Sequence, residues 1–145
     1  MGFTGNFWYD IHMVWRWVVL AVALFTVGRA LIGWQGKQPW TDLDDRLGMI
    51  FTVTVDIQFL LGLILWFVGP FRITEAGALM GNTLARFMVI EHPLFLTIAL
   101  ALAHIGRSRS RKAGSDTGKH KVAFIFYLLS FLFIVLIFVL RMTIR

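Results

Sequence analysis

Four long runs of apolar residues, separated by shorter polar stretches, dominate the hydropathy pattern of this chain. They cover residues 11–34, 48–68, 84–105 and 122–140. Each reaches the roughly 20 residues that cross a hydrocarbon core. None alternates between apolar and polar positions as a membrane β-strand does, and lipid offers no hydrogen-bond partners to an open backbone. The pattern predicts an all-α integral membrane protein, a single four-transmembrane-helix bundle.

Composition agrees with this prediction and narrows the chemistry. Hydrophobic residues make up 58% of the 145 positions, more than in an ordinary soluble domain, and the four runs leave no room for one. The chain has no cysteine. Disulfides, thiolate metal sites, iron–sulfur clusters and covalently attached haem are therefore excluded. Any haem has to be held non-covalently.

Basic residues predict the orientation in the membrane. Residues 106–121 look like a basic, mobile loop, with Arg107, Arg109, Arg111, Lys112, Lys119 and Lys121 against one acid. By the positive-inside rule this loop should be cytoplasmic, so both termini should lie on the outer, periplasmic side. The first apolar run should remain as a membrane helix, because no basic stretch precedes it. The charge suits contact with anionic lipid headgroups, not with nucleic acid.

Two histidines stand out within the apolar runs. His92, in the third run, lies between Glu91 and Pro93, and His12 lies near the start of the first run. Ionisable groups at membrane depth are expensive and usually functional. Because the first and third runs cross in the same direction, we expect His12 and His92 at one end of the bundle. Two facing imidazoles can hold a haem iron.

The neighbours of these histidines extend the hypothesis. Arg16, four residues after His12, shares its helix face. We expect it to meet a haem propionate or to neutralise Glu91, which otherwise supports a ligand or handles protons. Arg86 should join the same cluster. The alternative is a structural ion pair near the interface, with His12 solvated among headgroups. Pro93 should free the carbonyl of Val89 and kink its helix.

A second polar set lies nearer the cytoplasmic side. Asp56 needs a partner within the membrane, and Arg29 is the expected one, as a structural intramembrane pair. A second haem would need His104, but twelve residues from His92 leave the two histidines about 120° apart around a helix. One haem b per chain is therefore the prediction. His120, between two lysines, should be a solvated loop residue.

Other functions remain open alternatives. No zinc-protease, nucleophile or phosphate-binding motif is present, so enzymatic activity extends at most to an electron-transfer subunit of an oxidoreductase complex. The chain also suits a cofactor-free accessory subunit of a respiratory or photosynthetic membrane complex. A further variant has His92 alone bind the magnesium of a bacteriochlorophyll. Haem binding requires both histidines, chlorophyll binding requires one of them, and a scaffold requires neither.

Three stretches carry a resemblance to known proteins. They are HMVWRW from His12, ARF to EHP across Ala85 to Pro93, and GRSR to KHK across Gly106 to Lys121. Together they resemble small bacterial four-helix membrane proteins labelled cytochrome b-like, loosely of the cytochrome b561 type. The resemblance implies a bacterial inner-membrane protein that binds haem, with His12 and His92 at the matching positions. Some members carry histidine where this chain has Asp56, which counts against an inner haem.

Overall fold

The chain folds into four long helices. The computed structural model describes residues 5–72, 77 and 80–144. Its helices are α1 (Phe7–Gln35), α2 (Asp42–Val68), a continuous rod made of α4 (Thr83–Arg86), the π-helical turn η2 (Phe87–Glu91) and α5 (His92–Lys112), and α6 (Asp116–Thr143). Within the described residues all regular structure is helical, and four helices are long and apolar enough to cross a membrane. The predicted all-α bundle with four candidate spans is confirmed at this level.

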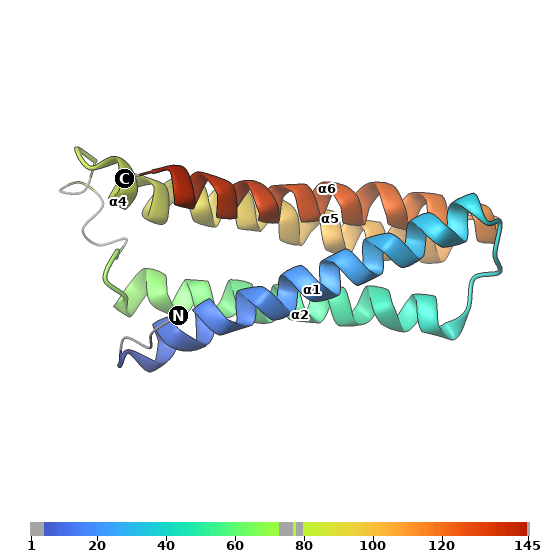
Figure 1. Ribbon diagram of the computed structural model, residues 1–145, viewed down its shortest axis with the longest axis horizontal. Coiled ribbons are helices and arrows are strands. Elements are labelled where there is room, and N and C mark those ends of the chain that lie inside the picture. Colours follow the sequence, from blue (N-terminus) through green and yellow to red (C-terminus); the bar gives the residue numbers. More distant parts are fainter. Residues whose placement is uncertain (1–4, 73–76, 78–79, 145) are drawn as a thin grey trace.

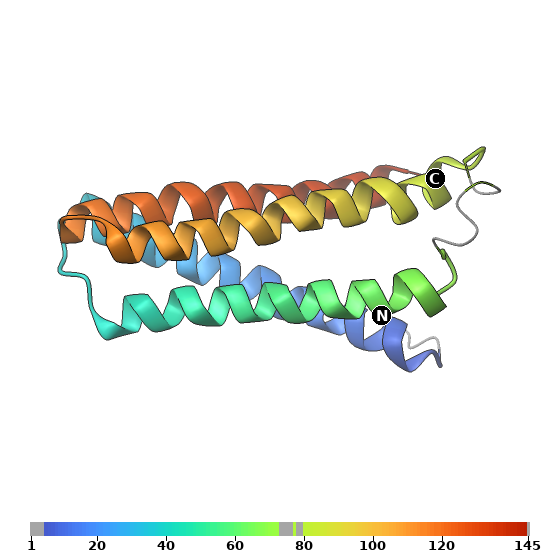
Figure 2. The ribbon, with the colours of Figure 1, turned by 180° about the vertical axis from the view of Figure 1, so that it is seen from behind.

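The helices run antiparallel to their neighbours around the bundle. α1 packs against α2 and α6, and α5 packs against the same two helices. The start of α1, the end of α2, the start of α4 and the end of α6 lie together at what we call the terminal end (Figure 1). The connections 36–41 and 113–115 lie at the opposite, turn end (Figure 2). α1 lies beside α6 at the turn end and diverges from it toward the terminal end.

Polar side chains fix where the helices begin. Asn6 accepts a hydrogen bond from the amide of Tyr9 (3.1 Å), and Asn82 accepts one from the amide of Ala85 (3.0 Å). Ser115 does the same for Gly118 (3.0 Å). Such caps pair amides that the first helical turn leaves without partners.

The helices extend beyond the apolar runs, most of all around the basic segment. The predicted loop 106–121 is wrong: α5 continues to Lys112, α6 begins at Asp116, and only residues 113–115 connect them. Arginine, lysine and serine are compatible with a helix, and long basic side chains reach water from its exposed face. The apolar runs in the sequence therefore underestimate the length of the helices.

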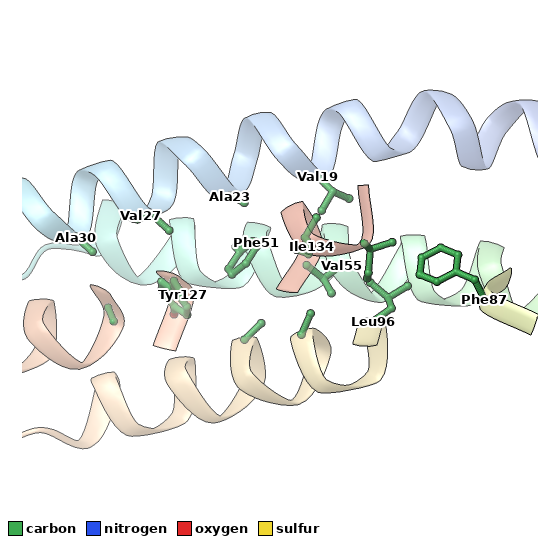
Figure 3. Close-up of a cluster of buried hydrophobic side chains, with 14 residues drawn as sticks. Val19, Ala23, Val27, Ala30, Phe51, Val55, Phe87, Leu96, Tyr127 and Ile134 are labelled. Carbon is green, nitrogen blue, oxygen red and sulfur yellow. The ribbon is translucent and has the colours of Figure 1, made fainter. Parts of the chain in front are cut away.

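Small residues let the helices approach closely along one line. Val19, Ala23, Thr26 and Ala30 share one face of α1 and are all buried. Figure 3 shows the buried side chains in a row along the bundle, from Ala30 near the turn end to Phe87 near the terminal end. Ser130 of α6 donates a hydrogen bond to the carbonyl of Ala99 in α5 (2.7 Å), which pairs a polar group within this core.

Candidate functional site

A cavity of about 720 Å³ lies at the terminal end of the bundle. Residues of α1, α2, the η2–α5 rod and α6 all line it, among them His12, Arg16, Gly62, Trp66, His92, Phe138 and Arg141. Its walls are mostly apolar. Both size and lining match sites that hold cofactors or small ligands, which run from about 300 to 1,000 Å³. The divergence of α1 from α6 leaves this space.

The two histidines predicted as a pair face each other in this cavity. The ring centres of His12 and His92 are 6.1 Å apart, with their planes at 61°. A metal–nitrogen bond of about 2 Å, with about 1 Å more to each ring centre, puts two imidazoles on opposite sides of one metal atom about 6 Å apart. His12 is only 8% exposed, and its Nδ1 is buried without a hydrogen-bond partner. The spacing therefore fits a shared axial-ligand pair.

The chain before His92 is wound as a π-helix. Pro93 has no amide hydrogen and so cannot bond to the carbonyl of Val89. That carbonyl instead accepts a hydrogen bond from the indole Nε1 of Trp66 in α2 (2.9 Å). As predicted, Pro93 cannot pair with the carbonyl of Val89, and the structure shows that Trp66 does so instead. Single π-helical turns often mark functional sites, because the extra residue resets the direction of the side chains that follow.

Contacts with α2 fix the position of His12. Gln58 donates from Nε2 to the backbone carbonyl of His12 (3.3 Å), and Trp15 donates to the carbonyl of Thr54 (2.9 Å). Gly62 faces the imidazole, since a Cβ atom there would lie 3.5 Å from Cε1 of His12. The bare backbone of Gly62 thus keeps the cavity open beside the ring.

The predicted charged neighbours separate into two groups. Glu91 pairs with Arg86 (2.8 Å) on the partly exposed side of the rod, so the prediction that Arg16 neutralises Glu91 is wrong. Arg16 lines the cavity instead, with its guanidinium 5.1 Å from the ring of Trp17 and 5.2 Å from that of Phe138. It forms no salt bridge with any residue that the structure describes.

Comparison of the chain with protein-family models, curated proteins and solved structures gave no match. The chemistry of the site therefore has to be argued from its own side chains. Within the described residues, no three histidine, cysteine or acidic side chains converge to hold a metal ion. Two imidazoles suit a metal whose other positions a macrocycle supplies.

The predicted pair of Arg29 with Asp56 is wrong. Arg29 binds Asp44 (2.9 Å), while Asp56 binds His104 of α5 (2.7 Å). Trp15 and His12 lie opposite Thr54 and Gln58, and this register puts Arg29 beside the start of α2, about 20 Å along the helix from Asp56. The sequence supplied the charges but not the register between the two helices.

His120 was also placed wrongly. Its side chain is fully buried at the turn end, with Nε2 3.3 Å from the carbonyl of Pro39 and 4.0 Å from Asp44. Its ring lies against Trp40, with centres 5.1 Å apart. The sequence did carry a signal, because His120 shares one helical face with the core residues Ala123, Tyr127 and Ser130.

Sequence reasoning did not assign four of the lining residues, Gly62, Trp66, Phe138 and Arg141, to a site. Trp66 was interpreted as an interfacial anchor, Phe138 as a bulky side chain that packs against lipid, pigment or another subunit, and Arg141 as a charge on the outer side. The position of Arg141 three residues after Phe138 put both on one face of α6. That spacing was visible, but nothing in the sequence showed that this face borders a cavity.

Proposed function

We propose that this chain is an integral membrane cytochrome b-like protein that binds one haem b and transfers electrons, alone or as a subunit of a larger complex. The observation that carries the proposal is the facing pair His12 and His92, at 6.1 Å, inside a cavity of about 720 Å³. The three short stretches from which we expect a likeness to cytochrome b-like membrane proteins favour the same assignment.

The residues around the cavity fit such a group. The largely apolar walls suit a flat macrocycle, and the buried, unpaired Nδ1 of His12 shows an imidazole that the protein alone does not satisfy. His12 and His92 would be the axial ligands. Arg16 would meet a propionate. Glu91, which precedes His92 in the sequence and has one buried oxygen without a hydrogen-bond partner, would handle a proton near the site. Haem supplies one-electron chemistry when bound.

The proposed setting is the inner membrane of a bacterium, with the terminal end periplasmic. Basic residues concentrate at the turn end, on the last turns of α5 and the start of α6, which favours a cytoplasmic position for that end. The haem would then lie in the outer half of the membrane. Its redox partner would be another subunit or a carrier that reaches the terminal end.

A dithionite-reduced minus oxidised spectrum of the purified protein, with a pyridine haemochrome assay, tests the proposal. We expect a sharp b-type band at about one haem per chain. His12→Ala and His92→Ala should each abolish the low-spin spectrum, because each removes one axial ligand. His104→Ala is the matched control and should leave it unchanged. A low-spin spectrum that survives His12→Ala would contradict the ligand assignment.

The same variants separate the alternatives. A bacteriochlorophyll needs a single imidazole, so its bound absorption would survive His12→Ala and disappear in His92→Ala. A cofactor-free accessory subunit would give a flat spectrum even when expressed with ample haem, and would purify with the complex it supports.

A further inference from the structure

Two arginines on adjacent helices border the cavity at the terminal end. Arg16 lies on α1 and Arg141 in the last turn of α6, and both line the cavity. Phe138, one turn before Arg141, packs against the guanidinium of Arg16 at 5.2 Å. Since Phe138 and Arg141 share a face of α6, the two arginines lie on the same side of the cavity.

Neither arginine has an acidic partner among the described residues. Glu91, which the sequence suggested as a partner of Arg16, is bound by Arg86 at 2.8 Å instead. Nε of Arg16 is buried and has no hydrogen-bond partner. Two cations beside one apolar cavity repel each other, and charge near hydrocarbon is costly unless it is paired. An anion bound between the two guanidiniums would relieve this repulsion.

We infer that Arg16 and Arg141 form an oxyanion site that fixes the orientation of the cavity's ligand. A guanidinium binds carboxylate or phosphate through two parallel hydrogen bonds, and two guanidiniums suit a ligand with two acidic groups. The acidic edge of the ligand lies between α1 and α6, and its apolar body extends toward His12 and His92. That the anion belongs to the haem rests on the proposed function. The phosphate of an anionic lipid has the same chemistry.

Titration with a matched pair of porphyrins tests this site. Protein purified without haem is titrated with iron protoporphyrin IX and with its dimethyl ester, which keeps the macrocycle and removes both charges. We expect the free acid to bind at least about ten-fold more tightly, as charge-assisted hydrogen bonds allow. Arg16→Gln and Arg141→Gln should each weaken the free acid about ten-fold and leave the ester unchanged. Arg72→Gln, at the same end but bonded to the carbonyl of Gly69, is the control.

The outcomes separate the two proposals. If both porphyrins bind equally well to the wild type, the two arginines do not hold the acidic groups of the haem, although haem binding stands. If neither binds, haem binding is wrong. In either case, thermal unfolding in micelles with phosphatidylglycerol or phosphatidylcholine decides whether the arginines bind an anion. A higher Tm with phosphatidylglycerol in the wild type and Arg72→Gln, but not in Arg16→Gln or Arg141→Gln, identifies lipid phosphate as the anion. Equal Tm values in all proteins overturn the inference.

Discussion

Buried histidines at the two ends of this bundle have opposite surroundings, a cavity at one end and close packing at the other. At the terminal end His12 and His92 border about 720 Å³ of space. At the turn end His120 packs against Trp40 and Asp44 around a gap of about 10 Å³, which is hardly room for one water molecule. Protein interiors are normally packed as densely as organic crystals. The turn end follows that rule, and the terminal end departs from it where a cofactor is proposed.

The connections and the smallest residues explain the difference. The short segments 36–41 and 113–115 hold helix pairs together at the turn end, and Gly33 allows the ring of His120 to lie directly on the backbone of α1. At the terminal end α1 has diverged from α6, and Gly62 adds space next to His12. A ligand that fills an apolar cavity adds van der Waals contacts, so the proposed haem would stabilise the fold as well as serve function.

The largest effect on stability should come from removing Asp44 at the turn end. Its carboxylate accepts hydrogen bonds from the amide and hydroxyl of Thr41 (2.9 and 3.0 Å) and pairs with Arg29. Asp44→Ala removes the capping hydrogen bonds at the start of α2 and leaves Arg29 without its acidic partner. We expect the free energy of unfolding in mixed micelles to fall by about 3 kcal/mol. Asp44→Asn, which keeps an acceptor, should lose less. Equal losses would show that the charge of Asp44, and not a neutral acceptor at this position, carries the stabilisation.

The next largest effect on stability should come from Gly33 at the turn end, in contrast to Gly62 at the terminal end. A methyl group on Gly33 would overlap the imidazole of His120, whereas one on Gly62 would make an ordinary 3.5 Å contact with His12. Gly33→Ala should therefore destabilise the fold by about 1–3 kcal/mol, and Gly62→Ala should be neutral or slightly stabilising. Denaturant unfolding of both variants checks this. Adding His120→Ala to Gly33→Ala should restore part of the lost stability, because it removes the overlapping ring. If no stability is restored, the overlap with His120 is not the cause of the loss.

These residues also show what the sequence could predict. The apolar runs fixed the four helices, and His12 with His92 on parallel spans predicted the facing pair. Hydropathy carries no information on interhelical register, however, so Arg29 was assigned to Asp56 when the register brings it to Asp44. Nor does it show which face of a helix borders a cavity, so Gly62 and Arg141 emerged only from the structure. The burial of His120, by contrast, was predictable from the helical face that it shares with Ala123 and Tyr127.

A smaller effect should follow from the hydrogen bond that supports the π-helical turn. Trp66→Phe leaves the carbonyl of Val89 without its donor, which should cost about 1 kcal/mol. In a Pro93→Ala background the chain regains an amide that can reach this carbonyl, so the same substitution should cost less. A double-mutant cycle on the free energy of unfolding measures the difference. Additive effects would show that Trp66 and Pro93 act independently.

The smallest effects should come from the exposed ion pairs, one at each end. Arg86 and Glu91 meet at 2.8 Å at the terminal end, and Arg111 and Asp45 at 3.0 Å toward the turn end, with side chains between 29% and 55% exposed. Because solvent and headgroups screen such pairs, Arg86→Gln and Arg111→Gln should each change stability by no more than about 1 kcal/mol. Thermal unfolding of the two variants at low and high salt measures this, and the effects should be similar at both ends. A much larger loss in Arg86→Gln would mean that freeing Glu91 beside His92 disturbs the cavity itself. The contrast between the ends would then extend from their packing to their charges.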